Sequence, residues 1–142
     1  MKLFVATKAL IRRPDGKVLL LREADGYVVG TNAGKYDVPG GRLEEGEQPL
    51  HCLLREIREE TALHVSVEAP FYVGDFRPVV DGEQWQIVPI YFACEAAASE
   101  QVDLGPDHDD YVWIDAASSA EYDLVPGLQE VFVAYQSRNS RS

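Results

Sequence analysis

Cysteine is scarce in this 142-residue chain, which carries only Cys52 and Cys94. Two thiols supply neither the several bridges of a disulfide-stapled secreted domain nor a four-cysteine zinc site, so we expect both to be buried and reduced. No apolar run approaches the ~20 residues that a membrane-spanning helix needs. The first thirteen residues are interrupted by Lys8 and show no small-residue cleavage site. These absences predict a soluble, cytoplasmic protein.

Positive charge is also scarce, since 13 Lys and Arg residues stand against 24 Asp and Glu residues, for a formal net charge of −11. Such a surface is unsuited to broad electrostatic binding of a nucleic-acid polymer or an anionic membrane. If the substrate is itself an anion, the site needs a bound cation to neutralise it.

The hydrophobic content is 46%, which is too high for a disordered chain and enough for a packed core. The length predicts a single domain over residues 1–142, with 137–142 as a frayed tail. No internal repeat, low-complexity block or linker divides it.

Strand and helix patterns alternate along the chain. Apolar and β-branched runs predict strands at 3–12 and 17–22, joined by a turn over 13–16, and then at 65–73, 84–96 and 111–114, with a short extended piece at 36–41. Helical spacing predicts helices at 48–61 and 126–135, and loops are expected at 23–35 and 97–110. The turn signal Asp81-Gly82 joins the strands 65–73 and 84–96. This mixture indicates an α/β or α+β fold with a mixed sheet.

Three carboxylates crowd one face of the first predicted helix. Glu56 and Glu60 are four residues apart, and Glu59 lies three from Glu56. A solvated acidic face is one interpretation. The other is a site for a hard cation such as Mg²⁺, which binds carboxylate oxygens, waters and substrate phosphates. The Gly40-Gly41 pair before the helix favours the second interpretation, because glycines let backbone carbonyls approach a ligand closely.

The same segment resembles the Nudix box, G-x5-E-x7-R-E-U-x-E-E-x-G-U, where U is a bulky aliphatic residue. Gly41 is followed after five residues by Glu47, and after seven more by Arg55-Glu56. Ile57, the pair Glu59-Glu60 and Leu63 match the remaining defined positions. The one departure is Ala62, where the family has glycine.

The resemblance implies an α/β/α sandwich with a mixed sheet and an Mg²⁺-dependent hydrolase, with Mn²⁺ as the alternative ion. Its substrate would be a nucleoside diphosphate linked to another moiety: a nucleoside triphosphate, ADP-ribose, a nucleotide sugar or a dinucleoside polyphosphate. Carried over by position, Glu59 and Glu60 would be the main metal ligands, and Glu56 a third ligand or the base that activates water.

The resemblance also implies supporting residues. Arg55 would orient the carboxylates, Glu47 and Gly41 would support the loop and the arginine, and the carbonyl of Gly40 would be a further ligand. Asp107 stands in the acidic place of a Glu-His…Trp stretch often seen after the box, which makes it a candidate extra ligand or base. A polar loop is the competing interpretation of Asp107.

The family glycine usually takes the left-handed conformation just past the helix. Ala62 pays roughly 1–2 kcal/mol for that conformation, so either the helix closes differently here or the strain is tolerated.

The sequence does not determine which residues recognise the substrate. Trp85, Tyr91 and Trp113 could stack a base or belong to the core, and Arg22, Lys35 and Arg77 could meet phosphates or form surface pairs. A non-catalytic nucleotide-sensing module on the same fold is the alternative function. In either case the partner is a nucleotide-type small molecule, and the protein is expected to be a monomer or a homodimer.

Overall fold

The computed structural model describes residues 1–25 and 32–138. The elements follow one another as β1 (Lys2–Arg12), β2 (Val18–Glu23), β3 (Tyr36–Asp37), β4 (Gly40–Arg42), α1 (Pro49–Thr61), β5 (Val65–Val73), β6 (Val79–Val80), β7 (Glu83–Ala96), β8 (His108–Ile114), the 3-10 helix η1 (Ala116–Glu121) and α2 (Leu128–Ser137).

The sheet is mixed, as the sequence predicts. Its main path runs β3-β2-β1-β7-β5, with β4 on β1, β8 on β2 and β6 on β7. Strands β1 and β7 are parallel over their whole shared length, from Lys2 opposite Trp85 to Arg12 opposite Glu95, whereas the other pairs are antiparallel. Strands β1 and β2 form the predicted hairpin next to its turn, where Arg12 pairs with Val18. Farther from the turn, β1 pairs with β4 instead, through Ala6 to Lys8.

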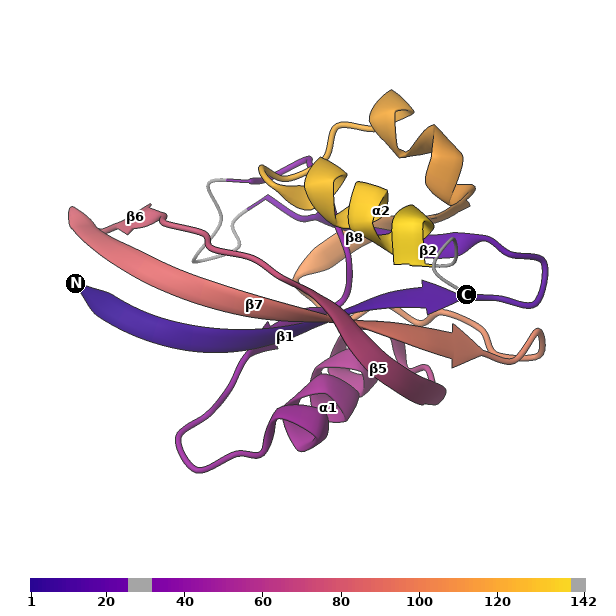
Figure 1. Ribbon diagram of the computed structural model, residues 1–142, viewed down its shortest axis with the longest axis horizontal. Coiled ribbons are helices and arrows are strands. Elements are labelled where there is room, and N and C mark those ends of the chain that lie inside the picture. The colour runs from indigo at the N-terminus through magenta and orange to yellow at the C-terminus, as the bar shows by residue number, and fades with distance from the viewer. Residues whose placement is uncertain (26–31, 139–142) are drawn as a thin grey trace.

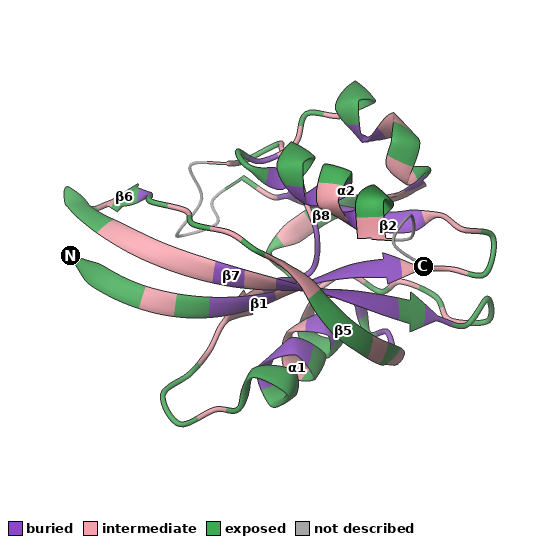
Figure 2. Cartoon of the chain, in the orientation of Figure 1, coloured by how far each residue is buried: buried purple, intermediate pink, exposed green. Residues whose placement is uncertain are grey.

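Helices cover both faces of the sheet, so the α/β/α sandwich is confirmed (Figure 1). Helix α1 packs against one face through a core that includes Leu19, Leu21, Leu53 and Ile57. Helix α2 covers the other face through a second core centred on Phe132. Burial is concentrated along the middle of the sheet, as Figure 2 shows, and both cysteines are buried and free.

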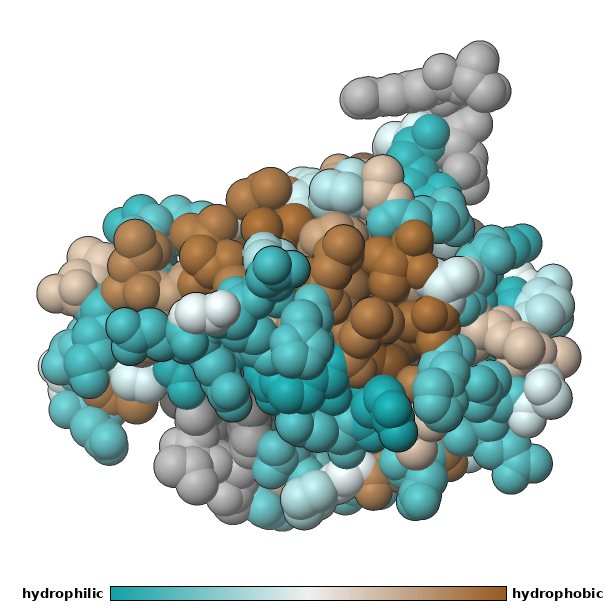
Figure 3. Space-filling view, turned by 90° about the horizontal axis from the view of Figure 1, so that it is seen from below, coloured by the Kyte–Doolittle hydropathy of each residue, from teal (hydrophilic) through white to brown (hydrophobic). Residues whose placement is uncertain are grey.

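Helix α1 agrees with the predicted span 48–61 to within one residue. Pro49 occupies the first turn, where its missing N–H is not needed. Leu53 and Ile57 are buried, whereas Leu50 and Leu54 are 52% and 40% exposed, so the apolar stripe is wider than the sheet covers. Viewed from the α1 side, the surface carries hydrophobic areas between hydrophilic ones (Figure 3). Ala62 ends the helix with φ 62°, and its N–H donates to the Arg58 carbonyl, so the left-handed conformation is adopted despite the Cβ.

Several boundaries differ from the sequence prediction. Strand β8 begins at His108 and not at 111, because residues 108–110 pair with the end of β2. The short strand β6 and the helix η1 were not predicted, and α2 begins at Leu128 after Gly127 in the left-handed region and continues to Ser137. The predicted loop 23–35 starts one residue too early, because Glu23 still belongs to β2. Part of that loop lies outside the described residues, as does most of the predicted tail. No helix in the described part of the chain is long and apolar enough to cross a membrane.

Candidate active site

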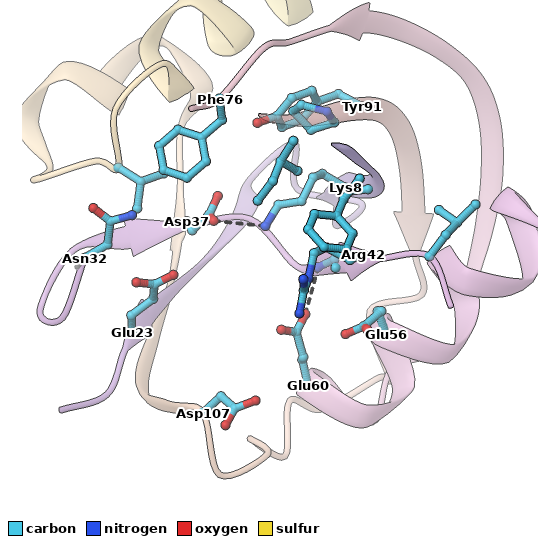
Figure 4. A pocket seen from close by; sticks show the side chains of 18 of the residues that line it. Lys8, Glu23, Asn32, Asp37, Arg42, Glu56, Glu60, Phe76, Tyr91 and Asp107 are labelled. Carbon is cyan, nitrogen blue, oxygen red and sulfur yellow. Dashed lines mark hydrogen bonds and ion pairs between the residues drawn. The ribbon is translucent and has the colours of Figure 1, made fainter. Parts of the chain in front are cut away.

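A cavity of about 540 Å³ opens between the carboxylate face of α1 and the strands β1 to β4. It contains almost all the residues that the Nudix-box resemblance selects, together with several that it does not. The residues that line this cavity include Lys8, Glu23, Asp37, Gly40, Gly41, Arg42, Arg55, Glu56, Glu59, Glu60, Phe76, Tyr91 and Asp107. Figure 4 shows Glu56 and Glu60 on one side of the cavity and Glu23 and Asp37 on the other.

Arg55 holds the carboxylates of the helix wall together. Its Nε donates to Glu47 Oε2 at 2.6 Å and its Nη2 donates to Glu47 Oε1 at 2.9 Å, a bidentate pair. Its Nη1 reaches Glu56 and Glu59, each at 3.2 Å. The hydrogen bonds from Arg55 lower the pKa of Glu47 to about 2, and those to Glu47 raise the pKa of Arg55. Arg55 is therefore a fixed cation with carboxylates on several sides.

Glu60 is the most deeply placed of the three helix carboxylates, with its side chain 12% exposed. Its Oε1 accepts a hydrogen bond from the backbone N–H of Gly40 at 2.7 Å, which ties the helix to strand β4. Burial raises the pKa of Glu60 to about 8, against the opposing effects of Lys8 and the Gly40 N–H. Burial likewise raises the pKa of Glu56, against the attraction of Arg55. A carboxylate in this state gains most from an added cation.

The two glycines of β4 allow the close approach of strand and helix. Gly40 has φ 142°, and a Cβ there would collide with the backbone carbonyl of Thr7. A Cβ on Gly41 would lie 2.5 Å from the carboxyl carbon of Glu56. A side chain at 41 would therefore displace the Glu56 carboxylate from its position beside the strand.

The oxygen atoms at this site are of the kind that bind a hard divalent cation. Oxygen ligands from carboxylates and a carbonyl are what Mg²⁺ and Mn²⁺ prefer. Among residues 1–25 and 32–138, however, no three His, Cys, Asp or Glu side chains are already gathered as a metal cage. Glu59 is turned to Arg55 and Glu60 to the Gly40 N–H. The carboxylates thus face one cavity but are held by hydrogen bonds that an ion would have to compete with or replace.

The opposite wall comes from the strands and was not predicted. Lys8 on β1 donates to Asp37 on β3, with 2.9 Å between Nζ and Oδ2 and both side chains 15% exposed. Burial alone lowers the pKa of Lys8, but Asp37 and Glu60 outweigh it, so the pKa is raised and the ammonium is retained. Glu23, at the end of β2, is 9% exposed and its Oε2 has no hydrogen-bond partner. The sequence signal for these two residues was weak, because each is a single charged residue in or at the end of a mainly apolar run.

Asp107 does line the cavity, at the point where the segment after β7 returns to the sheet. Its carbonyl accepts from Ala24, and two residues earlier Gly105 donates to the carbonyl of Glu60 at 3.1 Å. A Cβ on Gly105 would lie 2.5 Å from the Glu59 carbonyl. Gly105 therefore lets this segment close over the end of α1, a role that sequence reasoning missed.

The other residues considered for substrate recognition differ in whether they line the cavity. Tyr91 lines the cavity, whereas Trp113 packs against the core on the α1 side and Trp85 packs on Phe4. Arg22 and Arg77 form exposed pairs with Asp109 and Asp75, and neither they nor Lys35 lines the cavity.

Comparison with known proteins agrees with this geometry. The pattern of the family described as NUDIX domain matches residues 2–135. The nucleoside triphosphatase NudI of Escherichia coli strain K12 is 32% identical over 117 residues, which cover 78% of this chain and 81% of that protein. An octanoyltransferase of Myxococcus xanthus is also 32% identical over 124 residues, but the chain spans only 32% of its length, so that name describes a much longer protein.

Solved structures are similar over nearly the entire chain. The MutT protein from Methanosarcina mazei superposes with a TM-score of 0.83 at 25% identity, covering 99% of this chain and 97% of that one. The NUDIX domain of Shewanella oneidensis NrtR, solved with ADP ribose, has a TM-score of 0.73 at 16% identity, covering 97% and 88%. The latter likeness is one of fold alone.

Proposed function

The chain belongs to the NUDIX domain family and is a Nudix pyrophosphohydrolase, and from this premise we propose that it hydrolyses nucleoside triphosphates with the help of Mg²⁺ or Mn²⁺. The observation that carries the proposal is the convergence of Glu56, Glu59 and Glu60 with Gly40 on one cavity, joined to a relative named a nucleoside triphosphatase. ADP-ribose, nucleotide sugars and dinucleoside polyphosphates are the competing substrates.

The metal would be held by Glu56, Glu59, Glu60 and the carbonyl of Gly40. When bound, a divalent ion acidifies a water and offsets charge on the pyrophosphate. Arg55 does not take this role, because its donors already serve Glu47, Glu56 and Glu59.

The side chains around the proposed metal site have different roles. Arg55 keeps the carboxylates oriented through charge-assisted hydrogen bonds, and Glu47 fixes Arg55 from the loop. Glu56 is the proposed base, because burial raises its pKa toward the range where a carboxylate takes a proton usefully. Asp107, which also lines the cavity, would contribute a further oxygen.

Arg42 is the cation at the cavity that can meet a substrate phosphate. Among the described residues it makes no ion pair, and its guanidinium lies over the rings of Phe4 and Trp85 at 4.6 and 5.0 Å. Stacking on aromatic faces fixes the group without consuming its N–H donors. It therefore offers free donors to an anion.

The second candidate is a nucleotide sensor on the same fold, which would bind without turnover. We place it behind hydrolysis because a binder gains nothing from three carboxylates that raise the cost of holding an anion. We further propose a cytoplasmic monomer or homodimer built from one domain, acting on a small-molecule nucleotide.

The deciding experiment measures turnover of nucleoside triphosphates, ADP-ribose, a nucleotide sugar and a dinucleoside polyphosphate, each with Mg²⁺, with Mn²⁺ and with chelator. We expect metal-dependent turnover that is highest for a triphosphate. Cleavage of another class alone would replace the substrate, and tight binding without any cleavage would establish the sensor. Activity retained in chelator would contradict the metal requirement.

A further inference from the structure

Glu23 breaks the pattern of the strand on which it lies. Leu19 and Leu21 of β2 point into the core beneath α1 and are fully buried. Glu23 is the next residue on the same face of β2 and is only 9% exposed, yet it carries a carboxyl group. A charged residue in an apolar row costs stability and is retained where it has a task.

The backbone holds Glu23 firmly in this place. Its N–H donates to the Lys35 carbonyl at 2.9 Å, and its own carbonyl accepts from Gly34 at 2.8 Å. On the other side of β2, the pairing with β8 shifts register between Arg22 and Glu23. Such irregularities re-aim side chains next to functional sites. The carboxyl is thus a positioned group on a rigid strand end.

One oxygen of this carboxyl is unsatisfied by any group in the described chain. Its Oε2 is buried with no hydrogen-bond partner, and the nearby Lys8 ammonium donates to Asp37 instead. Burial raises the pKa of Glu23, with Asp37 adding to the effect and Lys8 opposing it. Figure 4 shows the group facing the cavity, across from Glu60. A buried unpaired acceptor aimed into a cavity is completed by donors from a ligand.

We propose that Glu23 determines base specificity by accepting hydrogen bonds from the N–H edge of a nucleobase, with guanine as the best match. This rests on the proposed nucleotide hydrolysis. Guanine presents two adjacent N–H donors, at N1 and N2, which pair with the two oxygens of one carboxylate. Thymine and uracil present a single N–H between two carbonyl oxygens, which a carboxylate repels.

The rest of this side of the cavity suits a heterocycle better than a second cation. Phe76 and Tyr91 supply aromatic surface in the same cavity, and planar rings pack well against such walls. The Lys8 ammonium opposes a cation here, and no cage of His, Cys, Asp or Glu exists in the part of the chain that the structure describes.

The test compares dGTP, dITP and dTTP, because hypoxanthine, the base of dITP, differs from guanine only by the missing 2-amino group. For the wild type we expect kcat/KM for dGTP to exceed that for dITP on the order of 10-fold, the worth of one charge-assisted hydrogen bond. In Glu23→Gln the dGTP-to-dITP ratio should fall to within about twofold of one, with little change for dTTP, as expected when one oxygen acceptor is lost. Glu68→Gln on the exposed face of β5 is the matched control and should change none of the three values.

A binding measurement separates this inference from the hydrolysis on which it rests. Calorimetric titration of the metal-free protein with dGMP and dIMP should show the same preference, abolished by Glu23→Gln. A Glu23-dependent preference with no turnover of any triphosphate would retain the inference and overturn the hydrolysis. Equal affinities in the wild type would overturn the inference even if the variant failed to fold. Equal losses for all three substrates in a folded variant would also overturn it.

Discussion

The two walls of the cavity compensate their charges in different ways. On the helix wall Arg55 serves Glu47, Glu56 and Glu59 at once, so negative charge is left over for a cation to complete. On the strand wall Lys8 and Asp37 neutralise each other. The helix wall therefore favours a metal ion, whereas the strand wall presents a compensated ion pair beside one unpaired carboxyl, that of Glu23. A site that binds a charged phosphate chain and a neutral ring needs both kinds of wall.

Removing charge from the helix wall should have the largest effect. We expect Glu56→Gln, Glu59→Gln and Glu60→Gln each to lower turnover by a factor on the order of 10² to 10⁴, since each removes a metal ligand or the base. Without metal, the three variants should be no less stable than the wild type, because like charges at these spacings repel. Steady-state turnover against Mg²⁺ concentration and thermal melting with and without Mg²⁺ provide the measurements.

The exposed Glu45→Gln in the preceding loop is the control and should keep wild-type turnover. If Glu56 is chiefly the base, its variant keeps more of its metal affinity than the other two. Wild-type turnover in all three variants would make the carboxylate helix a solvated face.

Breaking the pair on the strand wall should cost stability more than activity. Lys8→Met leaves Asp37 buried without its partner, which we expect to lower the free energy of unfolding by roughly 3 kcal/mol. Arg13→Met breaks the exposed pair with Asp15 and should cost at most about 1 kcal/mol. Denaturant unfolding measures both. A cost for Lys8→Met as small as that for Arg13→Met would show that the strand wall is solvated.

Acid should weaken the helix wall through Glu47. The folded-state pKa of Glu47, about 2, lies below its ordinary value of 4.5, so its contribution to stability is complete above pH 4.5 and is lost as the pH falls toward 2. The difference in unfolding free energy between the wild type and Glu47→Gln should therefore shrink steadily over that interval. Melting curves at several pH values check this, and a difference that does not vary with pH would refute the role of the Arg55 pair.

The smallest effect is expected where α1 ends. Ala62 has φ 62°, a conformation that costs a residue with a Cβ roughly 1–2 kcal/mol. Glycine removes that cost but adds entropy to the unfolded chain, so Ala62→Gly should leave stability unchanged or raise it by up to about 1 kcal/mol. Destabilisation by more than about 1 kcal/mol in denaturant unfolding would contradict the left-handed geometry at this position.

The helix wall could be predicted because its information is local. Residues 41–63 contain the glycine, the arginine and the three glutamates in one stretch, and helical periodicity alone places Glu56, Glu59 and Glu60 on one face. At Ala62 the sequence left two helix ends open, and the structure shows the left-handed one. Strands β1, β2, β5 and β7 are also local patterns, and their spans agree with prediction to within one residue.

The strand wall could not be predicted because it joins residues that the sequence keeps apart. Lys8 meets Asp37 only because β1 leaves β2 and opens the sheet at that point. The extension of β8 back to His108 likewise depends on pairing with the far end of β2, which a polar, acidic segment does not signal.

By itself, the sequence determined the mixed α/β architecture and the helix with its carboxylate face. Only the tertiary structure decided that Glu23 is buried and unpaired, that Gly105 closes over the end of α1, and that Arg42 lies on two aromatic rings at the cavity. The physical reason is that periodicity and backbone preference act over a few residues. Burial and charge compensation depend on every element packed around a group.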